Sequence, residues 1–510
     1  MQIRHKHYYS VMAIPIERKW LVHSQANARK WSFMNPGSAT ILLMLVYAAY
    51  FSIYTITRHR AFMTQSFDLS VYVQMLWNSL NGDLFRVTIQ PGRLNYLQHH
   101  FAPSMFLFIP VYGIWKNPEI LLVAQSLVLA SGAWPIYKVA SKGQLNQWRG
   151  VVFVLVYLLY PALQAANLYD FHEVTIAAPL LAWTWYFARN QIWPAFWITT
   201  FLALGFREEA VIITLGMGLV MACRQDTRRI GFGLVSLCLL WLSVLFAVSF
   251  FQSKFNMNAA LYFQERFGLG SNPFDAIKNI LADPNEILHR IFSAEKMLYL
   301  FNLLAPVGFL LLFSWESLFL VLPYVGLNLI GSYPLLIAPT QAQYNVLVVP
   351  MIVITAEIGS ARFSRFLSKH SKFSNRVWIP ILCFYMLLLS FGYQFRLAHL
   401  PYSPYFKWPQ ITERHQLANR IALEIPENAS LSVQDNLAPH ASQRRDLYIF
   451  PETNQAQYIY LDLWVLEDLR EKSVMDLTAQ VEAVLSAGSY ETVFEQDGLL
   501  LLRKTSFENE

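Results

Sequence analysis

Long runs of apolar residues, separated by short polar segments, fill the first 395 positions of the chain. A run of about 20 apolar residues is long enough to cross a bilayer as a helix. The pattern therefore predicts an all-α polytopic membrane protein with about eleven transmembrane helices. The expected spans are 39–57, 119–138, 151–168, 174–188, 192–206, 209–223, 230–251, 297–313, 317–332, 345–360 and 378–394.

The apolar run 102–115 is not expected to cross the membrane, because it is short and two prolines interrupt it. The stretch 67–85 before it has apolar residues at helical spacing and ends at Asn81-Gly82, a helix stop signal. Such amphipathic segments lie flat in the membrane interface. The loop 58–118 is therefore expected to hold juxtamembrane helices rather than a span.

The pattern changes character after residue 395. The expected elements are a helix at 411–425, short strands at 430–435 and 457–463, and a hairpin at 490–504 that turns at Asp497-Gly498. The sequence thus predicts an N-terminal segment 1–38, a transmembrane domain 39–395 and a small extramembrane α/β domain 396–510.

Composition supports this division. The chain is 55% hydrophobic, and only 14% of its residues are charged. This charged fraction is well below the value of about 25% that is usual for a soluble domain. After residue 395 lie 10 of the 39 Lys/Arg residues and 17 of the 33 Asp/Glu residues. The basic excess therefore belongs to the membrane part, where it indicates topology rather than nucleic-acid binding. The three cysteines, Cys223, Cys238 and Cys383, have no metal-ligand spacing and imply no disulfide framework.

Basic residues orient the spans. The positive-inside rule is satisfied when the N-terminus is cytoplasmic and 102–115 does not cross. The residues then placed inside are Lys138, Lys142, Arg149, Arg189, Arg224, Arg228, Arg229, Arg362, Arg365, Lys369, Lys372 and Arg376. The run from Ala39 lacks a cleavage site and is expected to be a retained first span. The α/β domain is then expected to be extracytoplasmic in a multi-pass plasma-membrane protein.

The outer loops contain the unusual polar residues. Asp68 precedes the amphipathic stretch, either as a functional acid or as a helix N-cap with Ser70 as the rival cap. His99 and His100 stand before the run 102–115; neighbouring histidines point different ways, so interfacial histidines are the alternative to a ligand-binding pair.

The segment "DFHEV" contributes Asp170, His172 and Glu173 after the third span, without the HExxH spacing of zinc proteases. In a helix Asp170 and Glu173 lie side by side, where two carboxylates raise a pKa or hold a divalent cation. Ordinary helix-end capping is the alternative.

Two further outer segments complete the set. "FREEAV" places Arg207, Glu208 and Glu209 where apolar sequence resumes at once, which requires a buried charge network or a functional site. The last outer loop has Tyr333, Gln343 and Tyr344, which suit a sugar or another polar ligand, or else form an aromatic interfacial belt.

These segments also carry a resemblance. "FDLSVYVQMLWN", "HHFAPSMFLFIPVY", "YPALQAANLYDFHEV" and "REEAV" resemble a bacterial family of predicted polytopic membrane proteins, and "SVQDNLAPHASQRRDLYIFPE" resembles that family's extramembrane tail. The layout is similar to GT-C-type membrane glycosyltransferases such as protein O-mannosyltransferases and the aminoarabinose transferases of lipid A. "HHFAPSMFLFIP" stands where those enzymes have a His-Pro-Pro-Leu-like segment, and it departs from that segment at His100.

The resemblance implies transfer of a sugar from a polyprenyl-phosphate donor to a glycan, lipid or protein acceptor on the outer face, within the lipid bilayer. Asp68 is then expected to be the base that takes the acceptor proton. His99, His100, Arg93 or Arg207 would bind the leaving phosphate. Asp170 and Glu173 would orient the acceptor, assist the base or hold a divalent cation; no other cofactor is implied.

Two other functions remain open at this point. A transporter or flippase of lipid-linked saccharides usually has polar residues near the bilayer midplane and an internal repeat; here the acids lie at span ends and no repeat is visible. A non-catalytic sensor or assembly protein would use the outer α/β domain to bind a partner.

Overall fold

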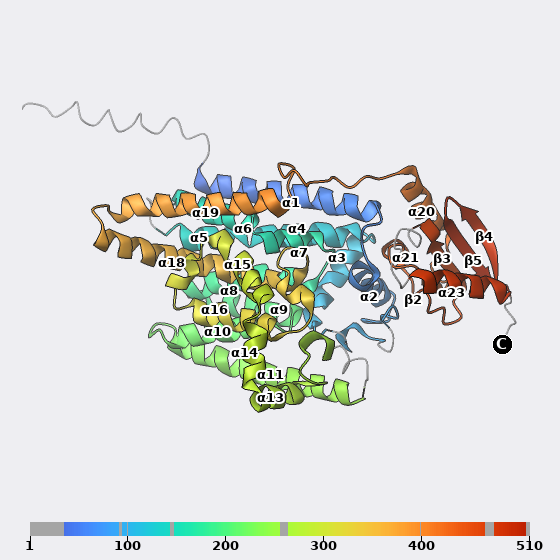
Figure 1. The fold of residues 1–510 in the computed structure, drawn as a ribbon, viewed down its shortest axis with the longest axis horizontal. Coiled ribbons are helices and arrows are strands. Elements are labelled where there is room, and N and C mark those ends of the chain that lie inside the picture. The colour runs from blue at the N-terminus through green and yellow to red at the C-terminus, as the bar shows by residue number, and fades with distance from the viewer. Residues whose placement is uncertain are drawn as a thin grey trace, which may run out of the picture.

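The computed structural model describes residues 35–90, 94–98, 100–142, 147–255, 264–397, 399–464 and 474–505. Most helices run along the long axis of the molecule, and the C-terminal α/β domain sits at one end of this bundle (Figure 1). We call the bundle end beside that domain the domain end and the other the opposite end.

Each predicted span contains helix in the described residues. The helices are α1 (Pro36–Arg60), α4 (Glu119–Ser131), α5 (Ala133–Ala140), α6 (Gln147–Leu158), α7 (Pro161–Leu168), α8 (Glu173–Arg189), α9 (Trp193–Phe206), α10 (Ala210–Ala222), α11 (Arg228–Phe255), α15 (Ala294–Leu304), α16 (Ser317–Leu320), α17 (Leu322–Ile330), α18 (Val349–His370) and α19 (Asn375–Leu397). Large apolar side chains are exposed along α1, α11 and α19, as lipid-facing helices require.

Breaks within the apolar runs make several helices short. Among the described residues, five helices are long and apolar enough to cross a membrane, and six if the bent pair α6–α7 is one span. Pro161 stands at that 47° bend, and Gly308 and Phe309 adopt left-handed backbone angles after α15. The number eleven therefore remains a prediction, although the helical membrane architecture is confirmed.

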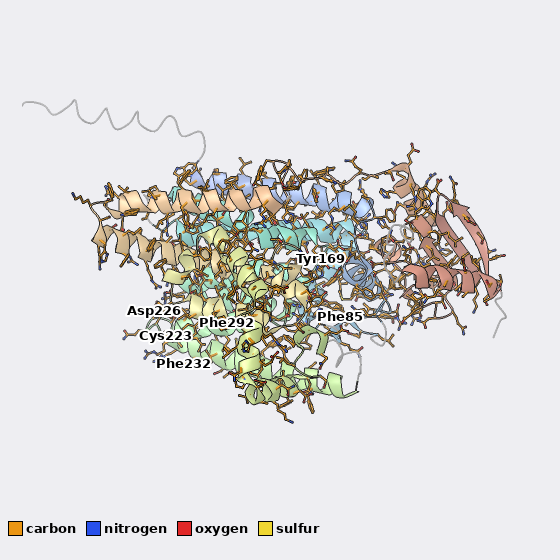
Figure 2. All side chains as sticks on the ribbon, viewed as in Figure 1. Phe85, Tyr169, Cys223, Asp226, Phe232 and Phe292 are labelled. Carbon is orange, nitrogen blue, oxygen red and sulfur yellow. The ribbon has the colours of Figure 1, made fainter. Side chains whose placement is uncertain are left out.

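The connections between helices separate by charge. The basic loops that follow α10 and α18 lie at the opposite end, whereas the loop before α2 lies toward the domain end (Figure 1). Phe85 and Tyr169 are labelled toward the domain end, and Cys223 and Asp226 at the opposite end (Figure 2). The unusual polar residues of the sequence are thus gathered near the domain end.

The segment between α1 and α4 is compact. It contains the π-helical turn η1 (Ser66–Ser70), α2 (Val71–Leu80), the 3₁₀ turn η3 (Pro103–Leu107) and α3 (Phe108–Ile114). The short helices η3 and α3 cover the run that was predicted not to cross. The amphipathic stretch is helical and ends before Asn81 as expected, but all side chains from Val71 to Leu76 are buried. Helix α2 therefore packs inside the protein instead of lying flat on lipid.

The C-terminal domain is a mixed sheet with helices. Its elements are α20 (Glu413–Glu424), β1 (Leu431–Val433), α21 (Ala438–Ala441), β2 (Leu447–Ile449), β3 (Tyr458–Asp462), α23 (Val474–Ser486), β4 (Tyr490–Gln496) and β5 (Leu499–Lys504). The strand order is β2-β1-β3-β5-β4, with β1 parallel to β2 and β3, and β5 antiparallel to β3 and β4. The predicted helix, both strands and the hairpin are present, while β2 and α23 were not predicted.

Hydrogen bonds fasten this domain to the loop that contains α2. The fully buried Gln74 donates to the carbonyl of Arg445 at 3.0 Å. Thr88 exchanges two hydrogen bonds of 2.9 Å with the backbone of Leu447, and Arg86 pairs with Asp446 at 2.7 Å. Since buried polar groups are costly without partners, the loop and the domain form one packed unit.

Candidate active site

A cavity of about 320 Å³ lies among the polar residues toward the domain end. Its volume is within the range of small-molecule sites. The lining residues are Gln65, Phe67, Asp68, Val71, Tyr72, Gln90, Tyr96, His100, Tyr169, His172, Arg207, Tyr333, Gln343 and Tyr344. Segments far apart in the sequence, from four different connections between the membrane helices, thus converge on one polar cavity.

Asp68 and His172 form a pair in this cavity. Asp68 Oδ1 lies 2.9 Å from His172 Nε2, and the Asp68 side chain is 17% exposed. Buried Gln125 of α4 fixes the histidine backbone by accepting from His172 N at 2.9 Å. Burial lowers the pKa of His172, but the Asp68 carboxylate outweighs it and the net shift is upward. The pair therefore places the Asp68 carboxyl group against the imidazole of His172.

Asp68 does not cap a helix. Helix α2 begins at Val71, and Ser70, the residue at its N-cap, makes no side-chain cap hydrogen bond. The N-cap interpretation of Asp68 is wrong because the π-helical turn η1 carries Asp68 ahead of the helix and leaves its carboxylate in the cavity.

Arg207 belongs to a buried charge network behind the cavity. Its guanidinium donates to Glu173 Oε1 at 2.5 Å and also pairs with Glu209, which accepts from Arg266 at 2.6 Å. Glu173 is fully buried and accepts a second hydrogen bond from Tyr72. Neither Glu173 nor Glu209 lines the cavity. The two acids therefore hold Arg207 in place, and Arg207 is the charge presented to a ligand.

Glu208 fixes the segment that carries His100. Its Oε1 accepts from the backbone N–H of Phe101 at 2.5 Å and lies 3.4 Å from His100 Nδ1. The ring of His100 lies 3.3 Å from Arg207 Nη1. His100 and Arg207 are thus neighbours on one wall, whereas His99 and Arg93 lie outside the described residues.

Two carboxylates hold the backbone just before Asp68. Asp170 Oδ2 accepts from Gln65 N at 2.8 Å, and Asp435 Oδ1 accepts from Ser66 N at 2.8 Å. Burial raises the pKa of Asp170 to about 7, against the opposing charge of Arg58. Each carboxylate thus accepts a hydrogen bond from a backbone N–H that would otherwise be unpaired.

Asp170 and Glu173 are not side by side on a helix, as the sequence had suggested. Helix α8 begins at Glu173, and Asp170 has a left-handed backbone with φ +67°, which Asp tolerates better than most residues. Their carboxylates turn to different partners, Gln65 and Arg207. In the described part of the chain no group of three or more His, Cys, Asp or Glu residues is arranged to hold a metal ion.

The remaining wall is neutral and aromatic. Tyr333 and Tyr344 meet edge to face with ring centroids 5.6 Å apart. The Oε1 atoms of buried Gln90 and Gln343 have no hydrogen-bond partner among the described residues, and both side chains line the cavity. Unpaired buried amides are costly, so this wall is suited to a ligand that offers hydroxyl donors.

Comparison with known proteins identifies the family. Residues 58–501 match the family described as "Predicted membrane protein (DUF2079)". The chain belongs to this family. No curated protein matches. Among solved structures the DUF2079 chain is similar to ArnT from Cupriavidus metallidurans in the apo state, with a TM-score of 0.51 and 11% identity over 92% of this chain and 98% of that one. The expected resemblance to a GT-C-type layout is thereby confirmed for the fold.

Sequence reasoning missed several residues in or beside this cavity. Tyr72 follows Asp68 by four positions, a spacing that places both on one side of a helical segment and was available from the sequence. Tyr96 donates to the Tyr72 hydroxyl at 3.3 Å. Gln90 and Asp435 had no local signal. The folding of the α1–α4 segment brings Gln90 to the cavity, and the docking of the C-terminal domain brings Asp435 to Ser66, just ahead of Asp68.

Replacing Asp435 with alanine is expected to loosen the backbone ahead of Asp68. The change removes the acceptor of Ser66 N–H and of its hydroxyl. A hydrogen bond to a charged group contributes about 1.5 kcal/mol or more, which corresponds to about tenfold faster local exchange. Hydrogen–deuterium exchange of peptides covering 64–70 in the full-length protein measures this exchange rate.

The matched control for this change is Asp446→Ala, which removes the ion pair with Arg86 from the same interface. It should leave exchange at 64–70 near the wild-type rate. Equal exchange in wild type and Asp435→Ala would show that the domain does not hold this turn.

Proposed function

We propose that this chain is a membrane glycosyltransferase of the GT-C type that transfers a sugar from a polyprenyl-phosphate donor to an acceptor hydroxyl on the extracytoplasmic face. The observation that carries the proposal is that one cavity toward the domain end holds both a carboxyl group, Asp68, and a cationic wall formed by Arg207 with His100 beside it. Acid and cation are what the two ends of a glycosyl transfer require.

In the proposed reaction, Asp68 takes the proton of the acceptor hydroxyl while that oxygen bonds to the anomeric carbon of the sugar. The bond from the same carbon to the donor phosphate oxygen breaks, and the sugar is oxocarbenium-like between the two. Polyprenyl phosphate leaves with the bond electrons, stabilised by Arg207 and His100. Atoms and charge balance without a further reactant.

The surrounding residues have supporting roles in this proposal. His172 orients the Asp68 carboxylate by its hydrogen bond of 2.9 Å. Glu173, Glu208 and Glu209 are assigned to positioning, since each holds Arg207 or the His100 segment. Tyr333, Gln343 and Tyr344 form the wall on which the sugar would rest, and stacking and amide contacts are common means of binding hydroxylated rings.

The lipid part of the donor has a place at this cavity. Phe67 lines it and is 53% exposed. An exposed aromatic side chain next to the cationic wall is suited to the first isoprene units of a polyprenyl chain. Basic loops at the opposite end support a cytoplasmic location there and an extracytoplasmic location of the cavity.

The cavity's position weighs against a transporter. A flippase is expected to hold its substrate near the bilayer midplane. Here Asp68 lies in the turn η1 of the α1–α4 segment, and His172 and Arg207 stand at the ends of α8 and α9 rather than within these helices.

The proposal is tested in a strain from which the gene is deleted. Lipid extracts should accumulate a polyprenyl-phosphate sugar, and an extracytoplasmic glycan should lose that sugar; the wild-type gene should restore both. If neither lipid nor glycan changes under conditions in which the parent strain makes the protein, the glycosyltransferase proposal fails.

A further inference from the structure

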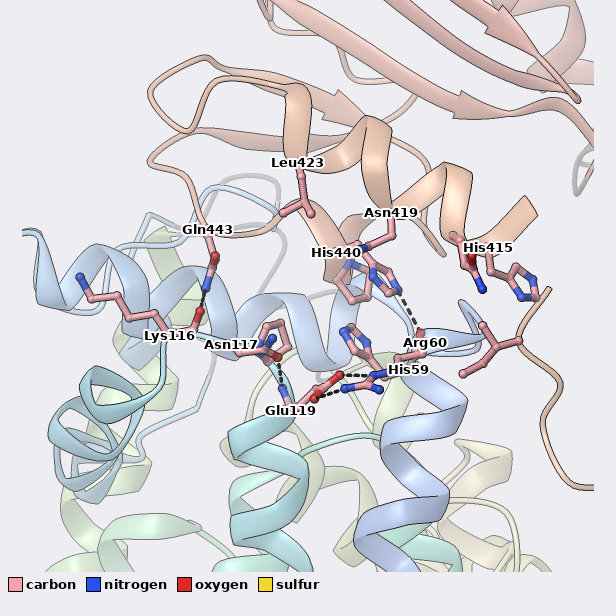
Figure 3. A pocket seen from close by; sticks show the side chains of 14 residues that line it. His59, Arg60, Lys116, Asn117, Glu119, His415, Asn419, Leu423, His440 and Gln443 are labelled. Carbon is pink, nitrogen blue, oxygen red and sulfur yellow. Dashed lines mark hydrogen bonds and ion pairs between the residues drawn. The ribbon is translucent and has the colours of Figure 1, made fainter. Parts of the chain in front are cut away.

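Two cavities of the described chain differ in how their polar groups are satisfied. A second cavity, of about 370 Å³, lies where the C-terminal domain meets the ends of α1 and α4 (Figure 3). Its one acid, Glu119, accepts two hydrogen bonds from Arg60. His440 Nε2 donates to the His59 carbonyl at 3.0 Å. Within the described residues, none of its lining side chains has a buried nitrogen or oxygen without a hydrogen-bond partner.

The candidate active site differs, because three of its lining side chains contain such an unpartnered atom. The atoms are Oε1 of Gln90, Oε1 of Gln343 and Nδ1 of His172. The histidine belongs to the pair with Asp68, whereas neither amide oxygen has a partner among the described residues. Both glutamines are 8% exposed. A buried polar group without a partner costs free energy, which a ligand that bonds to it restores.

The backbone that carries the two amides is fixed. Just before Gln90, the N–H of Thr88 donates to Gln74 Oε1 at 3.0 Å. Gln343 begins the 3₁₀ helix η8 (Gln343–Val348), whose side chains from Asn345 to Val348 are all buried. The last side-chain torsion of glutamine is soft, so each amide can turn either end to a ligand while its backbone stays in place. An amide both donates and accepts, as a hydroxyl group does.

The wall beside Gln343 brings no charge to the cavity. Tyr333 and Tyr344 line it with ring centroids 5.6 Å apart. The guanidinium of Arg266 lies 5.4 Å from the centroid of the Tyr344 ring, but it pairs with Glu209 at 2.6 Å and does not line the cavity. The backbone N–H of Tyr333 donates to the Arg266 carbonyl at 3.3 Å. Arg266 therefore supports a neutral aromatic wall, which suits the ring of a sugar.

The charges of the lining have other partners. Asp68 is the one acid among the described lining residues, and it is paired with His172 at 2.9 Å. Arg207, with His100 beside it, binds the phosphate in the proposed function. A sugar with an ammonium group would lack a counter-charge of its own, and one with a carboxylate would compete with the phosphate for Arg207. Because unpaired buried charge is costly, the lining favours an uncharged sugar.

We propose that the donor sugar is an uncharged ring with free hydroxyl groups, and that Gln90 and Gln343 are specificity-determining residues that each form a hydrogen bond to a hydroxyl of that ring. The inference rests on the proposed function and narrows the class of its donor. It separates this chain from the aminoarabinose transferases that its layout resembles, because the sugar of those enzymes carries an amino group.

The test measures the binding of defined lipids to the purified full-length protein by native mass spectrometry, without an acceptor. The probes are undecaprenyl phosphate, its glucose, galactose and mannose conjugates, and two charged conjugates, one with aminoarabinose and one with glucuronate. At least one neutral conjugate should bind about fivefold tighter than undecaprenyl phosphate or better, the effect of one hydrogen bond. Neither charged conjugate should bind tighter than undecaprenyl phosphate.

Two variants assign this preference to the amides. Gln90→Leu and Gln343→Leu remove an amide and keep a side chain of similar size. Each should lower the affinity for the preferred neutral conjugate about fivefold, while undecaprenyl phosphate, which has no sugar ring, binds as it does to the wild type. The control is Gln98→Leu, at an exposed glutamine of η2 (Tyr96–Gln98) that does not line the cavity. It should bind every probe as the wild type does.

Three results would overturn the inference and leave the proposed function standing. They are tighter binding of a charged conjugate than of every neutral one, neutral conjugates that bind no tighter than undecaprenyl phosphate, and a sugar preference that survives in both leucine variants. If the wild-type protein bound none of these lipids, the proposed function itself would fail, and the inference would fail with it.

Discussion

Arg207→Ala is expected to destabilise the protein by about 3–5 kcal/mol, the cost of leaving buried acids without their cation. Glu173 is fully buried, and Glu209 shares its charge between Arg207 and Arg266. Removing Arg207 leaves Tyr72 as the hydrogen-bond partner of Glu173 among the described residues. Thermal unfolding of the purified protein, monitored as the loss of its monodisperse size-exclusion peak, should show a clearly lower midpoint temperature.

Two variants make this test specific. Arg503→Ala removes an ion pair whose side chains are 51% and 48% exposed, so the unfolding midpoint should stay close to that of the wild type. Arg207→Ala/Glu173→Gln should recover part of the lost stability, because the uncompensated charge is then gone. A wild-type midpoint for Arg207→Ala would mean that these acids are not stabilised by this arginine.

How far the sequence predicts this charge network depends on how far apart its residues lie along the chain. "REE" at the start of an apolar run requires buried compensation, and the structure contains it: Arg207 pairs with Glu209 two residues away. Its other partner, Glu173, is 34 positions earlier. Hydropathy cannot select that residue, since only the packing of α8 against the α9–α10 connection brings the two together.

In the C-terminal domain, too, elements with a local sequence pattern were predicted and an element set by tertiary contacts was not. Alternating residues predicted β1 and β3, and Asp497-Gly498 predicted the β4–β5 hairpin, because each is a local pattern. Strand β2 has three residues, too few for alternation to be visible, and it exists through its parallel pairing with β1. Pairing of that kind is set by tertiary contacts.

Asp170 shows where a local pattern misleads. Spacing of three residues predicts neighbours only if the segment is helical. The backbone of Asp170 is instead left-handed at φ +67°, and its carboxylate binds the amide of Gln65, 105 positions away. The sequence grouped this acid with Asp68, beside which it lies, but did not identify Gln65 as its partner.

Asp68→Asn is expected to lower transfer by about 10²–10⁴-fold, the usual contribution of a general base, while the protein folds normally. The Asp68 side chain is 17% exposed and His172 is its hydrogen-bonding partner in the cavity. Asparagine keeps an oxygen for that histidine but cannot take a proton from an acceptor hydroxyl. The variant is introduced into the deletion strain at wild-type protein level, and the polyprenyl-phosphate sugar and the outer glycan are quantified.

The control is Asp83→Asn on the same loop, whose carboxylate is 42% exposed, pairs with Arg445 at 3.0 Å and does not line the cavity. It removes the same charge from the same segment and should restore the glycan fully. If Asp68→Asn restored it as well, Asp68 could not be the base. The base would then have to be sought at Asp170, which lies with Asp68 on an adjoining cleft of about 30 Å³ and whose pKa, raised by burial to about 7, is suited to proton transfer.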